Sequence, residues 1–378
     1  MTESLFGARW PQAAPLHLRG VILPSRVEAD LWVVEGKITF VPQLDAVELD
    51  DTRTTPSVHA SRWILSGLVD AHCHIGLGAG GGVTRSEAEA QALTDLRSGV
   101  TLVRDAGVPI DTAWLEGSSQ APKIIRSGRH IARPRRYLKD FGVEIEPDCL
   151  VEEVRRQASA SQGWVKLVGD WIDRDGGDLA PLWPADIAAQ AIRAAHEEGA
   201  RVTAHCFGEE SVSQLVRAGI DCIEHGCGLD SETVRIMAGE GIALVPTLDN
   251  WRIFPGIADQ AQDRFPTYAA HMRALYATRA EAIGAAIAAG VQVYAGTDAG
   301  GTRSHGTILP ELQALAELGG TDFALGAASW RARTWLGRPG LEEGAPADLL
   351  ILDSDPSRDL NSLASPAAIL LDGVPVVS

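Results

Sequence analysis

The chain has 378 residues, of which 45% are hydrophobic and 22% charged, an ordinary composition for a globular enzyme. Its net charge of −17 argues against a nucleic-acid partner, because binding to phosphates requires clustered Lys and Arg side chains. The first ten residues lack the apolar core of an export signal, and no apolar run is long enough to cross a bilayer. We therefore expect a cytoplasmic protein without a membrane partner.

Both ends of the chain predict β-structure. Residues 15–65 contain short runs rich in β-branched and aromatic side chains, and residues 348–352 and 368–377 repeat this character. We expect residues 1–62 and 341–378 to form one small β-sandwich domain.

The middle of the chain alternates between strand-like and helix-like segments. Ala-rich segments with helical periodicity separate most of the strands, and one of them is expected to begin at the N-cap Ser231 and end at Gly241. Eight strands alternating with helices indicate an α/β fold, a (β/α)8 TIM barrel over residues 63–340. The strand candidates are 63–74, 100–106, 122–128, 164–168, 200–206, 220–225, 242–248 and 291–298.

Side chains that can bind metal ions lie near the ends of five of these strands, where barrel enzymes place their chemistry. Alternation along the first strand puts two imidazoles on one face, with Cys73 opposite. The odd number and irregular spacing of the five cysteines predict buried, reduced thiols, with thiolate ligation as the alternative. The candidate ligands are His72, His74, Lys166, His205, His225 and Asp298.

With these residues in place, the chain resembles the amidohydrolase superfamily, in particular its two-metal members with a lysine ligand. The motifs at residues 204–208, 223–226 and 296–300 are most similar to the prolidase-like branch, which cleaves dipeptides. The resemblance implies that His72, His74 and Asp298 hold one metal and that His205 and His225 hold a second. Lys166 would bridge both metals, and since an ammonium offers no acceptor, it would do so as a carboxylated lysine. The alternative is a lysine paired with a carboxylate.

The same resemblance implies hydrolysis of a carbon–nitrogen bond in a small molecule such as a dipeptide or an N-acyl amino acid. A hydroxide bridging two divalent metals, zinc or else Mn, Co or Fe, would attack the carbonyl, and Asp298 would act as the catalytic base and then as the acid. His130, Arg136, Tyr137 and His305 follow barrel strands and are candidate substrate contacts, although each histidine could instead be structural. Homo-oligomerisation stays open.

Two positions depart from the prolidase-like pattern. Arg136 lies in the loop where relatives tend to carry a Gly-His pair, and Phe207 replaces a frequent Tyr after the strand that carries His205. Three alternatives therefore remain: a one-metal deaminase of the same superfamily, a lactonase or phosphotriesterase, and a non-catalytic scaffold. Glu209 lies one step later than the glutamate of the deaminases, where this chain has Gly208.

Overall fold

Strands from both ends of the chain pair in one sheet. The computed structural model describes residues 15–43, 47–48 and 62–376, and the remainder of the predicted sandwich segment lies outside them, as do residues 1–14. Within the described residues this sheet has eight strands in the order β22-β21-β20-β5-β1-β2-β3, with β4 paired to β1. The strands are β1 (Leu16–Ile22), β2 (Val27–Val34), β3 (Lys37–Thr39), β4 (Val47–Glu48), β5 (Arg62–Ser66), β20 (Leu349–Leu352), β21 (Ala368–Leu371) and β22 (Val374–Pro375).

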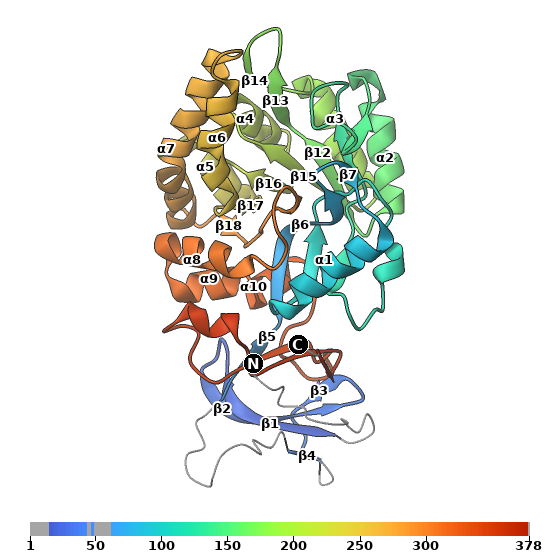
Figure 1. Cartoon of the computed structure of the whole chain (residues 1–378), viewed down its shortest axis with the longest axis vertical. Coiled ribbons are helices and arrows are strands. Elements are labelled where there is room, and N and C mark those ends of the chain that lie inside the picture. Colours follow the sequence, from blue (N-terminus) through green and yellow to red (C-terminus); the bar gives the residue numbers. More distant parts are fainter. Residues whose placement is uncertain (1–14, 44–46, 49–61, 377–378) are drawn as a thin grey trace.

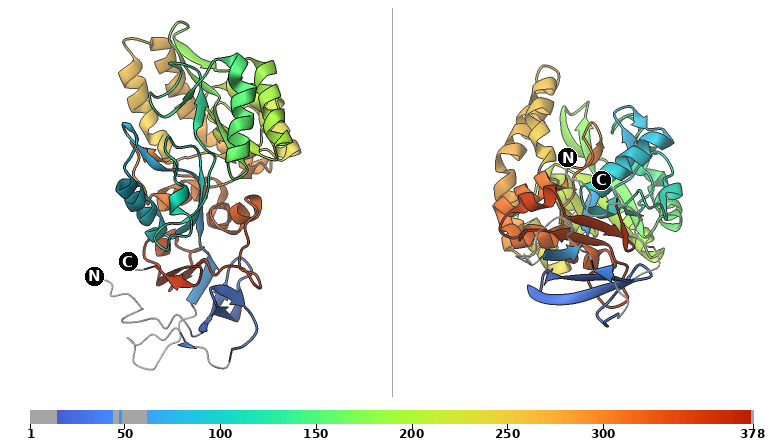
Figure 2. Two further views of the ribbon diagram at one scale, coloured as in Figure 1. Left: turned by 90° about the vertical axis from the view of Figure 1, so that its right-hand side faces the viewer. Right: turned by 60° about the horizontal axis from the view of Figure 1, so that its bottom comes forward.

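The terminal sheet has a core of its own. Leu16, Leu31 and Ile64 from the first part of the chain pack with Leu349 and Leu370 from its end in one buried cluster. Figures 1 and 2 show the blue N-terminal strands and the red C-terminal strands together at one end of the molecule. The sequence alternation of β1 is the cause, because every second residue of that strand is buried.

The expected single strand over 63–74 is two strands. β5 ends at Ser66 within the terminal sheet, and β6 (Leu68–Gly78) begins directly after Gly67. A Cβ atom on Gly67 would lie 2.2 Å from Oγ1 of Thr101, so only glycine allows the chain to pass this close to β8 (Val100–Asp105). Residues 63–66 therefore pair with a strand of the terminal sheet, and Gly67 separates them from β6.

Parallel strands fill the centre of the larger part of the molecule. β6, β8 and β9 (Lys123–Ile125) pair in one sheet, and a second sheet has the order β11-β10-β12-β15-β16-β17-β18. Backbone hydrogen bonds connect the two sheets at both edges, from Ala71 N to Ala295 O at 2.8 Å and from Gln162 N to Arg126 O at 3.0 Å. The second sheet consists of β10 (His130–Ala132), β11 (Gly142–Glu144), β12 (Trp164–Val168), β15 (Arg201–Cys206), β16 (Cys222–His225), β17 (Ala243–Val245) and β18 (Gln292–Val293).

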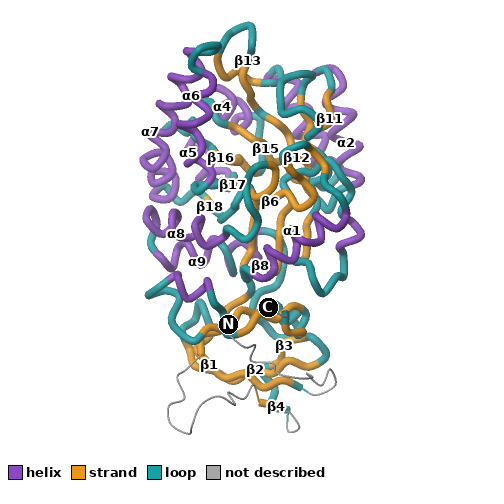
Figure 3. Tube along the Cα trace, in the orientation of Figure 1, coloured by secondary structure: helices purple, strands orange, loops and turns teal. Residues whose placement is uncertain are grey.

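Helices surround these strands, as Figure 3 shows in purple and orange. They are α1 (Arg85–Arg97), α2 (Leu150–Ala160), α3 (Ala185–Glu197), α4 (Glu209–Arg217), α5 (Ser231–Glu240), α6 (Phe254–Ala261), α7 (Pro266–Ala288), α8 (Ile308–Gly319), α9 (Thr321–Ala327) and α10 (Trp330–Trp335). Short 3-10 helices cover Ala113–Leu115, Pro147–Cys149, Asn250–Ile253 and Leu360–Ala364. The smaller strands are β7 (Gly81–Gly82), β13 (Asp170–Asp173), β14 (Asp178–Pro181) and β19 (Ala299–Gly301).

The N-cap of α5 lies one residue before the predicted one, whereas the C-terminal end of the helix is the predicted one. Asp230, rather than Ser231, is the N-cap, and its carboxylate accepts a hydrogen bond from Thr233 N at 2.7 Å. Gly241 ends the helix in the left-handed conformation, with φ 72°, as expected. In the part of the chain that the structure describes, no helix is long and apolar enough to span a bilayer.

An apolar layer supports the candidate site. Val69, Leu102, Trp164, Cys222 and Ala243 form a buried cluster contributed by the central strands. The next inward-facing residues along several of these strands are polar or charged and include Lys166 and Glu224, both almost completely buried. Charged side chains that are buried this deeply require specific partners. The residues at the ends of the central strands are therefore candidates for a functional site.

Candidate metal centre

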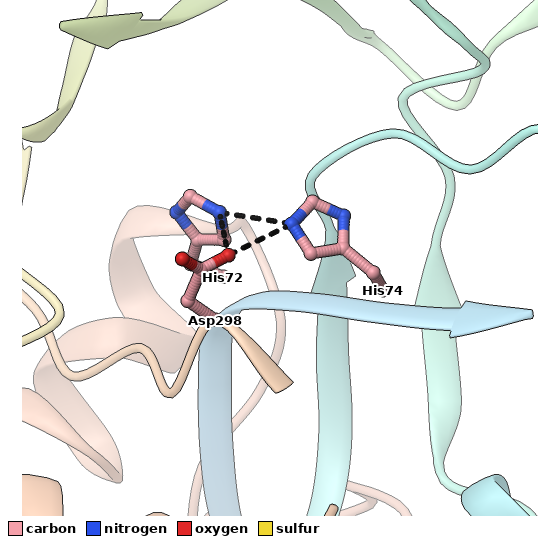
Figure 4. A group of neighbouring side chains, drawn as sticks. All are labelled: His72, His74 and Asp298. Carbon is pink, nitrogen blue, oxygen red and sulfur yellow. Dashed lines mark hydrogen bonds and ion pairs between the residues drawn. The ribbon is translucent and has the colours of Figure 1, made fainter. Parts of the chain in front are cut away.

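The first candidate group converges on one point in Figure 4. His72 and His74 lie on β6, and the distance between their Nε2 atoms is 3.1 Å. Oδ1 of Asp298 is 3.1 Å from His72 Nε2 and 3.0 Å from His74 Nε2. The pairing of β6 with β8 has a register shift between Asp70 and Cys73, the interval that contains His72. Three ligand atoms at these distances can surround a single small cation.

The hydrogen bonds made by Nδ1 determine which nitrogen of each histidine ring carries a proton. Nδ1 of His72 is 2.7 Å from Oε2 of Glu224, and Nδ1 of His74 is 2.7 Å from the carbonyl oxygen of Gly107. Because both partners only accept, each Nδ1 carries a proton, and each Nε2 faces Asp298. A positive charge, either a second proton on His72 or a metal ion, is favoured where the two Nε2 atoms meet this carboxylate.

The electrostatics of this group agree with that conclusion. Burial acts to lower the pKa of His72, but the carboxylates of Glu224 and Asp298 outweigh it, so the pKa is raised. Burial acts to raise the pKa of Asp298, but His72 and His74 hold it well below its usual range. Asp298 is therefore ionised at neutral pH, as the base in the expected reaction must be.

A second histidine pair lies at the ends of β15 and β16. Nδ1 of His205 is 3.0 Å from Nε2 of His225, and Nδ1 of His225 is 2.7 Å from Oγ1 of Thr247. His205 is buried, and its Nε2 has no hydrogen-bond partner. His225, Thr247 and Asp298 all have positive φ, 65°, 49° and 57°, a conformation that non-glycine residues rarely adopt. Strained backbone at three strand ends is a feature of functional sites.

Lys166 on β12 is 1% exposed, and its Nζ has no hydrogen-bond partner. Burial lowers the pKa of this amine, and the groups whose charges act on it include Glu224 and Asp298. The alternative of a lysine paired with a carboxylate is not what the structure contains, since Nζ donates to neither of these carboxylates. A buried amine without a partner is costly, so Lys166 is retained as part of the candidate site.

Glu224 and Arg104 support the first group and were not singled out from the sequence. Oε1 of Glu224 accepts from Nη2 of Arg104 at 2.6 Å and also from the hydroxyl of Thr203. Arg104 is completely buried, and its guanidinium lies 4.7 Å from the ring centroid of Trp164. Glu224 immediately precedes a histidine at a strand end, and this was the one signal that could have identified it.

Asn250 is a further residue that the sequence did not indicate. It follows β17 at the start of a 3-10 helix, and its Nδ2 donates to Oδ2 of Asp298. Both oxygens of Asp298 are therefore engaged, Oδ1 by the histidines and Oδ2 by this amide.

The four predicted substrate contacts separate into two sets. His130 is buried, its ring is stacked on His74 with centroids 5.2 Å apart, and its Nδ1 has no partner. The ring of Tyr137 lies 5.3 Å from that of His130 and 5.6 Å from that of His205. Arg136 instead donates to the main chain of the β13–β14 hairpin, to Trp171 O at 3.2 Å and Ala180 O at 3.1 Å.

The structure places His305 on the other side of β6. Its Nδ1 is 2.8 Å from Oδ2 of Asp95 on α1 and 3.8 Å from Sγ of Cys73, which points away from His72 and His74. Cys73 donates to the same carboxylate at 3.4 Å. All five cysteines are free, and four of them are buried, as the spacing predicted. His305 thus fixes a loop to α1 instead of contacting either ligand group.

Histidines and an aspartate at the ends of these parallel strands, with a lysine inside β12, give this mixed α/β fold a candidate metal centre. The family model described as "Amidohydrolase family" matches residues 63–376. An uncharacterised protein of Mycobacterium tuberculosis is 52% identical over 364 residues, which cover 96% of each chain. Ochratoxinase of Aspergillus niger is 26% identical over 410 residues, covering 93% of this chain and 83% of the other.

Solved structures agree with the fold. A putative prolidase from Bifidobacterium longum superposes with a TM-score of 0.79 at 24% identity, covering 97% of this chain and 96% of the other. An Xaa-Pro dipeptidase with bound methionine superposes with a TM-score of 0.78 at 21% identity, covering 96% and 99%. The chain belongs to the amidohydrolase family and is a hydrolase that acts on carbon–nitrogen bonds. The predicted resemblance is confirmed.

Proposed function

We propose that this protein hydrolyses an amide bond of a small molecule, such as a dipeptide or an N-acyl amino acid, with two divalent metal ions. Histidine nitrogen and carboxylate oxygen ligands favour zinc. His72, His74 and Asp298 would hold one ion and His205 and His225 the other. The observation that carries the proposal is the unpartnered, buried Nζ of Lys166, an amine on β12 whose charge acts on residues of both candidate ligand groups.

Carboxylation of Lys166 would explain why its Nζ is buried without a hydrogen-bond partner. Attack of the neutral Nζ on carbon dioxide, with loss of one proton, gives a carbamate whose two oxygens can each contact one cation. The burial that lowers the pKa of this amine favours the neutral form that reacts. The proposed bridging lysine therefore requires carbon dioxide but no protein group beyond the residues already described.

The fold that supports this centre is proposed to be a closed (β/α)8 barrel joined to a terminal β-sandwich. Supporting the barrel are the parallel pairing of the central strands and the hydrogen bonds at both sheet edges, including Asp298 N to His72 O at 2.8 Å. The pairing of β5 favours a domain boundary at Gly67, compared with the sequence estimate of residue 62.

The reaction assigns distinct roles to this chain's own groups. When bound, two divalent cations supply Lewis acidity that activates water and polarises a carbonyl. Oδ1 of Asp298 faces the histidines, which leaves Oδ2, held by Asn250, to take a proton from the attacking water. The same oxygen then returns this proton to the departing amine nitrogen as the carbon–nitrogen bond breaks. Glu224 and Gly107 keep both histidines oriented throughout.

The position of Glu209 argues against a one-metal deaminase. Its Oε2 is 2.9 Å from Nε2 of His271 on α7, so this carboxylate is occupied away from the histidine pairs. Gly208, at the position of the deaminase glutamate, has no side chain and donates its N–H to Asp170 at 2.7 Å. No glutamate is therefore available after β15 to move a proton at the candidate centre.

Metal counting on matched lysine variants tests the proposal. We expect two metals per chain by mass spectrometry and a carbamate signal by 13C NMR after incubation with labelled bicarbonate. Lys166→Ala should lose the carbamate, at least one metal and amide hydrolysis, whereas Lys139→Ala, at an exposed loop position, should retain all three. A single metal, with hydrolysis unaffected by Lys166→Ala, would overturn the two-metal proposal.

A further inference from the structure

Three aromatic side chains from different loops surround His205. The ring centroid of Phe207 is 4.3 Å from that of His205, that of Trp171 is 5.5 Å away and that of Tyr137 is 5.6 Å away. Tyr137 and Trp171 also meet edge to face, with centroids 4.9 Å apart. The side chain that would bind the second metal is thus enclosed by rings, and a group attached to the reacting carbonyl must pass against them.

The hairpin that carries Trp171 is held in place by hydrogen bonds to its main-chain oxygens. Trp171 lies on the β13–β14 hairpin, and Arg136 donates to the carbonyl oxygens of Trp171 and Ala180, one on each strand. Tyr137 follows Arg136 in the sequence and packs edge to face on Trp171, with ring centroids 4.9 Å apart. At the other end of the hairpin, Tyr268 N of α7 donates to Gly177 O at 3.2 Å. The rings are therefore pre-ordered, which reduces the entropy lost when a ligand packs on them.

Phe207 makes this wall apolar where a tyrosine would add a hydroxyl. It also packs on His225, with centroids 5.0 Å apart, and on Phe254 at 4.8 Å. Two nearby arginines already have partners: Arg136 binds the hairpin, and Arg303 forms an ion pair with Asp249. The side chains that contact His205 directly on this side are aromatic rings.

We propose that Tyr137, Trp171 and Phe207 form an aromatic subsite that binds an aromatic ring on one side of the scissile amide. This inference rests on the proposed function and gives it a substrate class. Aromatic rings favour offset or edge-to-face contacts with other rings at centroid distances of about 4.5–7 Å, a range that includes the 4.9 Å between Tyr137 and Trp171. Tyr137 and Trp171 are only partly buried, so each retains surface for such a contact.

The test compares three amides that differ only in where a ring is placed. N-acetyl-L-alanine has none, N-phenylacetyl-L-alanine carries a ring on the acyl side, and N-acetyl-L-phenylalanine carries one on the amine side. We expect kcat/KM to be at least about tenfold higher for one of the ring-bearing amides, the discrimination that a few buried carbon atoms give in an apolar pocket. The side that shows the preference identifies which product bears the ring.

Substitutions at Trp171 connect the preference to the subsite. Trp171→Ala should bring kcat/KM for the preferred amide to within about threefold of that for N-acetyl-L-alanine, and Trp171→Phe should retain most of the preference. Tyr276→Ala, which removes a partly buried aromatic ring on α7 beneath Arg279, is the matched control and should leave the ratio unchanged. Equal rates for all three amides, or a preference that survives Trp171→Ala, would overturn the subsite while leaving the hydrolase assignment intact.

A binding measurement separates failure of the subsite from failure of the proposed function. If the two-metal protein cleaves none of the three amides, the proposed function is wrong for this substrate class. Saturation-transfer NMR on the same protein then asks whether the ring-bearing amides still bind. Contact of their ring protons with the protein, lost in Trp171→Ala and kept in Trp171→Phe, supports the subsite, and absence of binding overturns it.

Discussion

Glu224→Gln tests how the histidines of the first group are oriented. The glutamate accepts from Nδ1 of His72 through Oε2 and from Arg104 and Thr203 through Oε1. A glutamine has only one acceptor oxygen and cannot satisfy both sides. If its oxygen faces His72, its amide group meets the guanidinium of Arg104. If it is reversed, His72 must move its proton to Nε2, the atom that would bind the cation.

Two magnitudes follow from this geometry. Loss of a hydrogen-bond partner that orients a ligand histidine typically lowers metal affinity roughly 10- to 100-fold. Arg104 and Glu224 are both completely buried, and a buried ion pair that loses one charge typically costs about 3–5 kcal/mol of folding stability. Glu224→Gln should therefore weaken zinc binding and lower the free energy of unfolding of the metal-free protein.

The assay is zinc competition against a chromophoric chelator, with urea unfolding of the metal-free protein alongside it. Glu311→Gln is the matched control, because Glu311 is equally buried but contacts Asp249 N instead of a ligand histidine. Adding Arg104→Met to Glu224→Gln should recover stability, since it removes the unpaired charge, but not zinc affinity. If Glu224→Gln binds zinc as tightly as the Glu311→Gln control, the orienting role assigned to Glu224 is wrong.

Three further outcomes are expected. Asp298→Asn should lower kcat/KM by about 10²- to 10⁴-fold, because the amide cannot take up a proton, and a pH–rate profile that keeps its acidic limb would contradict this. Burial raises the pKa of Glu311 from 4.5 to about 8, so the folded state holds a proton that the unfolded state has released. The free energy of unfolding should consequently fall between about pH 4.5 and 8 and level off above, a slope that Glu311→Gln should remove. His130→Ala should change KM or kcat, whereas His305→Ala should lower thermal stability and leave both constants unchanged, as steady-state kinetics and calorimetry can check.

The central strands and the positions of the candidate ligands could be predicted because each depends on local sequence. A strand end is marked by its apolar run, and a histidine or aspartate directly after that run lies at the catalytic face. His205 and His225 illustrate this, since each closes a strand that was predicted to within two residues. The pattern around Lys166 likewise placed a charged residue inside the predicted strand 164–168, which is β12.

What the sequence did not indicate depends on how strands meet in space. Arg104 and Glu224 lie on β8 and β16, strands that do not pair with each other, and their contact exists only across the interior of the fold. The path of a loop likewise depends on contacts between segments that are far apart in the sequence. His305 follows a tight turn in which Gly300 and Arg303 exchange backbone hydrogen bonds, and it then meets Asp95 of α1. No local pattern distinguishes that path from one over the candidate centre.

The junction at Gly67 has a mechanical consequence. β5 is held in the terminal sheet on both sides, and one residue later the backbone continues as the strand that bears His72 and His74. The terminal sheet therefore fixes the start of the strand that carries these two histidines. Catalytic groups must be held to within about 0.5 Å of their productive positions. A short connection to a hydrogen-bonded sheet can hold His72 and His74 in this way while the sequences of the surrounding loops vary.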